Sequence, residues 1–310
     1  MKMGATDSSS SSSSSSSLVV ALQDSLVAHN TNFDARLKSD QLRLDLLFRW
    51  MRCSCISANV LRPDISMKWF DKLCTLHSES TRHYHTLMHL EEIFLLLDLH
   101  QQAQQQQQQQ SPSRLPILSA LEEEAIVLAT FFHDAIYNVH SSTNEEDSAA
   151  LLEEFMRELA AAAASSHTNN ATFGGNSHSH HHKLQSLVVS IILATKHHQI
   201  QQQQPVDDDP HYHCMALFLD LDMAVLGKDA RAYQVYASLI RNEYRHVPQD
   251  VYCEKRAEIL TAFLQEQPQI FLTQAMTLAL EQRARDNLAA EIEMLQRGQI
   301  PNTNNSEEEE

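Results

Sequence analysis

His133 and Asp134 stand side by side at the end of an apolar run that predicts a helix over about residues 117–134. A buried carboxylate without a partner destabilises a protein by several kcal/mol or more. A bound cation would satisfy both side chains, and so would an ordinary buried hydrogen bond. The pair therefore indicates a metal site only in combination with other ligands.

Further ligands occur upstream and downstream of this pair. His85 and His89 are four residues apart, which places both on one face of a helix predicted over about residues 83–100. Asp220 and Asp222 interrupt a strongly apolar segment, where Asp usually has a ligand or a cationic partner. Asp220 would point away from Asp222 on a helix and is the weaker candidate. The predicted ligand set is His89, His133, Asp134 and Asp222. This mixture of imidazole and carboxylate suits Zn, Fe, Mn or Mg better than a structural thiolate site would.

Composition favours an all-α fold. The chain has 310 residues, of which 43% are hydrophobic, and it contains few of the glycines and prolines that tight turns need. Apolar periodicity predicts a single bundle of about ten helices without a convincing strand. The net charge of -17 disfavours a nucleic-acid backbone or an anionic membrane as the main partner.

The cysteines and the start of the chain bear on location. Five cysteines, an odd number without a Cys-x-x-Cys pair, indicate reduced thiols in an intracellular protein. No apolar run approaches the length of a membrane span, and the start lacks the apolar core of a secretory signal. We expect a cytoplasmic protein. An organelle transit peptide is disfavoured, because the serine-rich start has one lysine and no arginine.

Low-complexity segments divide the chain. We predict a disordered serine-rich tail over 1–17, a helical domain over 18–298 and an acidic disordered tail over 299–310. Polar surface insertions are predicted at about 101–114, 160–182 and 199–210. The glutamine tract of the first insertion should end the double-histidine helix. The histidines of the second, His178 and His180–His182, are predicted to lie in a solvated loop rather than to bind metal.

The remaining helices serve as scaffold. Early helices are predicted at Leu18–Val27, from Asp40 and over 66–78, with a turn at Pro63, and a later one begins near Thr143 or Asn144. Buried patterns over 183–198 and around Asp222 precede three C-terminal helices, over about 229–246, 249–266 and 270–297. Gly298 is predicted to end the last of them.

The order of the motifs resembles a known superfamily. The motifs are Arg-x-Tyr-His-x-x-x-His at 82–89, His-Asp-x-x-Tyr at 133–137, Asn-Glu-x-x-Ser-Ala at 144–149, Thr-Lys-His-His at 195–198 and Asp-x-Asp-x-x-x-Leu-Gly at 220–227. Together they resemble the HD-domain superfamily of predicted metal-dependent phosphohydrolases, over about residues 18–298. The arrangement is also distantly similar to the catalytic domain of cyclic-nucleotide phosphodiesterases.

The resemblance implies a function and roles for individual residues. It implies that His89, His133, Asp134 and Asp222 hold a divalent metal ion, whether Mn, Mg, Zn or Fe, and that metal-activated water cleaves a small phosphate ester, such as a nucleotide. His85 and Asp134 would be catalytic: His85 would give a proton to the leaving oxygen, and Asp134 could bridge to a second ion. The purine-binding glutamine of the phosphodiesterases has no counterpart here, so cyclic-nucleotide specificity is not implied.

Several other residues are candidates for supporting roles. Candidates for phosphate contacts are Arg82, Lys196 and Arg241, and candidates for a second metal are His197 and His198. Glu92 could orient an imidazole, and Asn144 and Glu145 could order the loop over the pocket. Each could instead be an ordinary surface or structural side chain.

Two other functions fit the same residues. An HD-type scaffold with two iron ions could perform oxygen chemistry, and a non-catalytic helical module could bind a metal or nucleotide. The sequence leaves the substrate, the native metal and the oligomeric state open.

Overall fold

The protein, seen in a computed structural model, is described over residues 40–56, 62–110, 118–166, 176–200 and 211–300. Within these ranges it forms ten α-helices and one short 3-10 helix, and no strand, so the all-α prediction is confirmed. The predictions for the serine tail, the Leu18–Val27 helix and most of the acidic tail lie outside the described ranges. No described helix is both long and apolar enough to cross a bilayer.

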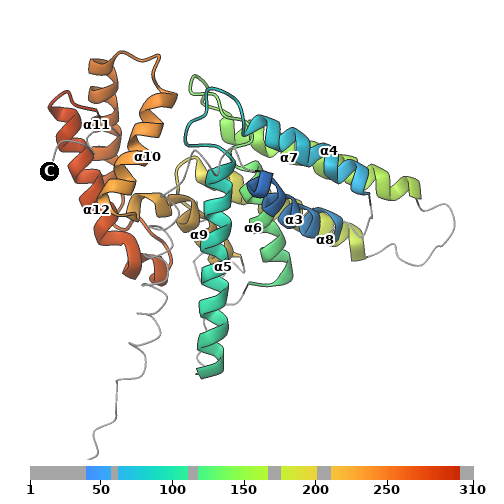
Figure 1. Cartoon of the computed structure of the whole chain (residues 1–310). Helices are drawn as coiled ribbons and strands as arrows, with labels where there is room; N and C mark the ends of the chain where they lie inside the picture. Colours follow the sequence, from blue (N-terminus) through green and yellow to red (C-terminus); the bar gives the residue numbers. More distant parts are fainter. Residues whose placement is uncertain (1–39, 57–61, 111–117, 167–175, 201–210, 301–310) are drawn as a thin grey trace, which may run out of the picture.

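In chain order the helices are α3 (Asp40–Ile56), α4 (Pro63–Leu76), α5 (Leu87–Gln110), α6 (Ala120–Phe132), α7 (Asn144–Ser166), α8 (Asn176–Thr195), α9 (Tyr212–Met223), the 3-10 helix η3 (Ala224–Gly227), α10 (Ala230–Glu243), α11 (Gln249–Glu266) and α12 (Gln274–Gln296). Figure 1 shows α10, α11 and α12 gathered on one side of the molecule and α3, α4, α7 and α8 on the other, with α5 and α9 between them. On one side α10 and α12 pack on η3, which follows α9, and on the other α3 packs on α5 and α8 on α9.

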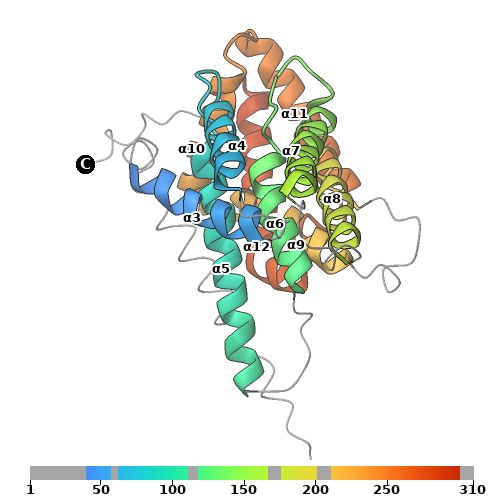
Figure 2. The ribbon, with the colours of Figure 1, turned by 90° about the vertical axis from the view of Figure 1, so that its right-hand side faces the viewer.

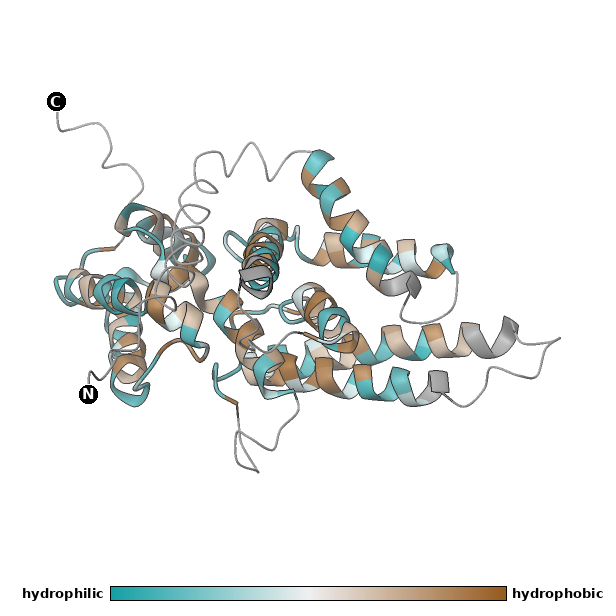
Figure 3. Cartoon of the chain, turned by 90° about the horizontal axis from the view of Figure 1, so that it is seen from below, coloured by the Kyte–Doolittle hydropathy of each residue, from teal (hydrophilic) through white to brown (hydrophobic). Residues whose placement is uncertain are grey.

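A cluster of aromatic rings forms the core beside α6. Trp50, Trp69, Phe131, Phe132 and Phe155 are all buried, and the Trp50 ring centroid lies 5.1 Å from that of Phe155 and 5.2 Å from that of Phe131. Figure 3 shows apolar and polar residues alternating along most helices, as expected for elements that bury one face. Because Phe131 and Phe132 immediately precede the first residue of the His-Asp pair, this core fixes the end of α6 in space.

Local hydrogen bonds define where the site-bearing helix begins. The Ser119 side chain accepts a hydrogen bond from the backbone N–H of Glu122, and the Glu122 carboxylate accepts one from the backbone N–H of Ser119. This capping box satisfies two backbone donors that a helix leaves unpaired. α6 therefore starts at Ala120, and His133 follows its last residue.

Helix α5 differs from its prediction at both ends. It begins at Leu87 rather than near residue 83, so His85 precedes the helix, and it continues through Gln110 instead of stopping at residue 100. Figure 2 shows its distal half projecting from the body. Glutamine is a good helix former, and the tract contains no Gly or Pro to end a helix. The glutamine tract therefore extends α5.

The second insertion is likewise more helical than predicted. α7 runs to Ser166 and α8 begins at Asn176, so the histidines predicted to lie in a loop belong to a helix. Alanine has the highest helix propensity, which explains why α7 continues through its alanine run. Pro63, predicted in a turn, occupies the first turn of α4, where its missing N–H has no partner to lose.

The aromatic core generates a stability prediction. We expect Phe155→Ala to lower the free energy of unfolding by about 3–5 kcal/mol, because it leaves a cavity among fully buried rings. Phe48, on α3, is 69% exposed, so Phe48→Ala should change the same quantity by about 0.5 kcal/mol or less. Urea unfolding followed by circular dichroism measures both. Equal losses for the two variants would contradict the assignment of this cluster as the core.

Candidate metal centre

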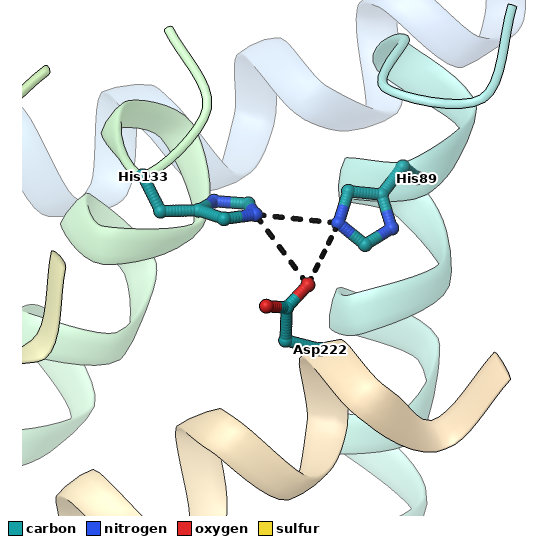
Figure 4. Close-up of side chains that lie close together, drawn as sticks. All are labelled: His89, His133 and Asp222. Carbon is teal, nitrogen blue, oxygen red and sulfur yellow. Dashed lines mark hydrogen bonds and ion pairs between the residues drawn. The ribbon is translucent and has the colours of Figure 1, made fainter. Parts of the chain in front are cut away.

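Three side chains from distant parts of the chain converge at the centre of the molecule. His89 comes from α5, His133 from the end of α6 and Asp222 from α9, and Figure 4 shows their polar atoms pointing toward one another. The Nε2 atoms of His89 and His133 are 3.2 Å apart, and Asp222 Oδ1 lies 3.0 Å from the first and 3.6 Å from the second. Both imidazoles are almost completely buried.

These separations fit a shared cation. Ligand atoms that bind one metal at about 2.0–2.2 Å lie roughly 3–3.5 Å from one another in tetrahedral or octahedral geometry. The observed 3.0, 3.2 and 3.6 Å fall close to that range. Two imidazole nitrogens and one carboxylate oxygen suit zinc, iron or manganese.

Asp134, the predicted fourth ligand, lies at the edge of this group. Its Oδ2 is 3.1 Å from His133 Nε2 and 3.9 Å from His89 Nε2. It is not among the described atoms that all lie within 4.8 Å of one another, namely those of His89, His133 and Asp222. Asp134 thus flanks the ligand triad on the side that faces His85.

The surroundings of His133 prepare its Nε2 as a ligand. Its Nδ1 lies 3.2 Å from the carbonyl oxygen of Ala129 and 3.1 Å from that of Thr130, so this nitrogen carries the proton that it donates. The lone pair of the neutral ring is then on Nε2, which faces the triad. Burial alone would lower the pKa of His133, but Asp134 and Asp222 outweigh it and hold the pKa well above its usual range.

Asp222 connects the triad to a third histidine. Its Oδ2 lies 3.2 Å from His198 Nε2, in the turn after α8. Burial would raise the pKa of Asp222, yet hydrogen bonds from His133, His198 and His89 hold it well below the ordinary value. Of the two candidates for a second metal, His198 thus reaches the site, whereas the side chain of His197 is exposed.

His85 is positioned by the buried carboxylate of Glu243, which is not among the predicted site residues. Glu243, at the end of α10, accepts hydrogen bonds through Oε1 from the backbone N–H groups of His83, Tyr84 and His85. Its Oε2 is 2.8 Å from His85 Nδ1 and 2.8 Å from the hydroxyl of Tyr137, whose ring stacks on His85. These contacts explain the bends before α5 and turn His85 Nε2 toward Asp134, 4.0 Å from Oδ2.

A sequence signal for Glu243 existed. It follows Ala237 and Ile240 at helical spacing, on the face that α10 buries. An acidic residue on an apolar stripe needs a partner, as Asp222 does. Burial would raise the pKa of Glu243, but His85 and the backbone donors lower it to about 2.

The three predicted phosphate contacts have other partners. Arg82 is buried and donates to the carbonyl oxygens of His85, Asp134 and Ala135, which ties the loop before α5 to the end of α6. Lys196 binds the carbonyl oxygen of Ser142 and the carboxylate of Glu146. Arg241 donates to the carbonyls of Tyr244 and Val247. These cations therefore supply donors to backbone carbonyls of the loops around the site.

Two carboxylates near the triad are also engaged elsewhere. Glu92 does not orient an imidazole in this structure; it forms a buried ion pair with Lys228, with 2.5 Å between the charged atoms. Asp220 accepts from the backbone of Leu272 and from Thr273, at the start of α12. Asp220 therefore anchors α12 and points away from the metal centre.

The Asn144 side chain holds the loop that follows the His-Asp pair. The Asn144 side chain accepts from the backbone N–H of Asn138 and donates to its carbonyl oxygen. Glu145 lies beside it, 3.9 Å from Lys196. Both residues line a pocket of about 320 Å³ that also borders His85, Asp134, His198 and Asp222.

Comparison with models of protein families, with curated proteins and with solved structures finds no match to this chain.

The ligand triad generates a binding prediction. We expect Asp222→Asn to weaken Mn²⁺ or Zn²⁺ binding by more than about 100-fold, because loss of a direct ligand should exceed the 10–100-fold cost of losing a supporting contact. Asp286→Asn, on the surface of α12, should bind metal like the unmodified protein. Isothermal calorimetry and elemental analysis of tag-free protein measure metal binding by both variants. Metal bound by the histidines of α8 contributes equally to both and does not affect the difference between them. Equal metal affinity in both variants would rule out the centre.

The buried Glu243 predicts a pH-dependent stability. Its folded pKa of about 2 lies below the ordinary value, so its contribution is present above about pH 4.5 and is lost as the pH falls toward 2. At about 1.4 kcal/mol per pKa unit, Glu243→Gln should lower the free energy of unfolding at pH 7 by roughly 3 kcal/mol. The deficit should shrink as the pH falls to 3. Urea unfolding at both pH values, with exposed Glu293→Gln as control, tests this, and a deficit that grows toward pH 3 would refute it.

Proposed function

We propose that the protein is a metal-dependent hydrolase of small phosphate esters, built on a helical domain of the HD type. The observation that carries the proposal is the convergence of His89, His133 and Asp222 beside a pocket that the candidate proton donor His85 also lines. The same residues stand in the motif order that resembles HD phosphohydrolases. Three candidate ligand atoms, of which Asp222 borders the cavity, and a proton donor that lines it are the parts that such hydrolysis needs.

The charge of the site supports a metal rather than a bare phosphate pocket. Asp134, Asp222 and Glu243 are all acidic, and the acidity would repel a phosphate unless a cation intervened. A divalent cation held by His89, His133 and Asp222 would supply an activated water and would offset the charge of the phosphate. The chain contributes the ligands, their orientation and the proton.

His85 is suited to give that proton to the leaving oxygen. Because its Nδ1 binds Glu243, its Nε2 is the nitrogen that faces the site. Burial alone would lower the pKa of His85, but the carboxylates of Glu243 and Asp134 outweigh it and raise the pKa, which favours the protonated ring. The stacked ring of Tyr137, with centroids 4.2 Å apart, limits rotation of the imidazole. A positioned, protonated imidazole is an effective general acid.

One observation favours a second candidate, an oxygen-dependent centre with two iron ions. His198 lies beside the second oxygen of Asp222, so this carboxylate could join two ions. Elemental analysis and turnover assays with and without oxygen distinguish the two candidates. Two bound iron ions with oxygen-dependent turnover would favour the oxygenase, and hydrolysis under argon would exclude it. Metal binding without turnover of any phosphate ester would indicate a non-catalytic module.

The proposal predicts a leaving-group-dependent effect of His85→Ala. Hydrolysis of phenyl phosphate should fall by about 10²–10⁴-fold, the usual contribution of a general acid. The loss on 4-nitrophenyl phosphate should be smaller, because nitrophenolate leaves without a proton. Metal content should stay at the level of the unmodified protein, because His85 is not in the ligand triad. Steady-state rates with Mn²⁺, Mg²⁺, Zn²⁺ or Fe²⁺ check both statements.

Control variants distinguish the role of His85 as proton donor from the role of Asp222 as metal ligand. His140→Ala, at an exposed histidine outside the pocket, should retain the rate on both substrates. Full hydrolysis by His85→Ala on phenyl phosphate would remove the assigned acid. Full hydrolysis by Asp222→Asn would contradict the metal mechanism itself.

A further inference from the structure

The pocket beside the metal centre extends toward α11 and ends in an environment unlike the ligand triad. Tyr84 packs on His89 with ring centroids 4.9 Å apart, and Tyr236 packs on Tyr84 at 4.7 Å. Arg256, on α11, hydrogen-bonds Tyr236 and lines the same pocket. Arg256 therefore lies beyond two aromatic rings from the metal ligands, where it would meet the organic part of a substrate rather than its phosphate.

Most of the wall between these two ends is apolar. Leu260 and Phe263 follow Arg256 at helical spacing on α11, so all three share one face of that helix. Met223 and Leu226 line the pocket next to Asp222. Within a volume of about 320 Å³, this wall favours a compact apolar group.

Arg256 is the one arginine or lysine among the described residues that line the pocket. Its charge is already matched: Nε donates to Glu291 Oε1 at 3.1 Å, the Glu291 side chain is 1% exposed, and its other oxygen accepts from Tyr233. The two terminal nitrogens of a guanidinium carry four more N–H bonds; Tyr236 takes up one of them, and the others can bind an acceptor in the pocket. An oxyanion bound by Arg256 would be repelled by the carboxylate of Glu291 on the same guanidinium, whereas a neutral carbonyl oxygen would not.

We propose that this site takes a phosphate ester whose organic group is compact and apolar and ends in a neutral hydrogen-bond acceptor, such as a carbonyl oxygen, which Arg256 binds. This specificity rests on the proposed function, because the phosphate end is assigned to the metal ligands. Arg256 would then select the substrate, while His85 and the triad act on its phosphate.

Phosphonates test the specificity apart from turnover, because their carbon–phosphorus bond is not hydrolysed. Binding of benzylphosphonate, 4-acetylbenzylphosphonate and 4-carboxybenzylphosphonate to the full chain loaded with Mn²⁺ is measured by calorimetry. The acetyl compound should bind about tenfold or more tightly than benzylphosphonate, the ratio expected for one hydrogen bond from a charged donor. The carboxylate compound should bind no more tightly than the acetyl compound.

A matched pair of variants tests whether Arg256 causes the preference for 4-acetylbenzylphosphonate over benzylphosphonate. Arg256→Lys keeps the charge beside Glu291 but removes the terminal N–H groups, so it should reduce the acetyl preference to about threefold or less without changing the affinity for benzylphosphonate. Arg285→Lys, which alters another arginine paired with a glutamate, outside the pocket, should keep the full preference. If Arg256→Lys does not fold, the ligand series on the unmodified protein decides alone.

The outcomes separate this inference from the proposed function. Metal-dependent binding of all three phosphonates without an acetyl preference would overturn the inference and leave the hydrolase proposal standing. Tightest binding of the carboxylate compound would replace the neutral acceptor with an oxyanion and would also overturn it, as would an acetyl preference that survives in Arg256→Lys. Failure of every phosphonate to bind would refute both proposals.

Discussion

Two imidazole nitrogens that face each other at 3.2 Å, beside a carboxylate and inside a helical core, are the constraint on which the rest of the structure depends. Such an arrangement needs a positive charge, either protons or a cation, because lone pairs and carboxylates cannot be left facing one another away from water. The raised pKa of His133 and the lowered pKa of Asp222 express the same requirement. The fold therefore contains a position that could hold a cation.

Two parts of the structure hold the residues around this position, one on each side. The aromatic cluster around Trp50 and Phe155 holds the end of α6, and with it His133. From the opposite side, Glu243 on α10 holds the loop before α5 through three backbone N–H groups and one imidazole. A single buried carboxylate thus links the C-terminal helices to the candidate acid. Its loss would affect stability and the geometry of the site together.

The basic residues divide between holding the chain and lining the pocket. Arg82 and Arg241 donate to backbone carbonyls, so they stabilise loop conformations near the site. Arg256 is paired with Glu291 and yet borders the pocket. Residue type alone does not distinguish these roles, because a guanidinium binds a carbonyl, a carboxylate and a phosphate by the same donors.

The sequence by itself determined the all-α class, several helix boundaries, such as both ends of α11, and the polar residues that converge in the triad, because apolar periodicity and polar residues within apolar runs are local signals. Local signals failed where a distant group changed the outcome: Glu243 holds His85 outside α5, and α5 continues through the glutamine tract. Only the tertiary structure decided that Arg82 binds carbonyls, that Glu92 pairs with Lys228 and that His198 rather than His197 reaches Asp222. Each of these side chains binds the partner that lies within about 3 Å, and the packing of helices far apart in the chain determines which partner that is.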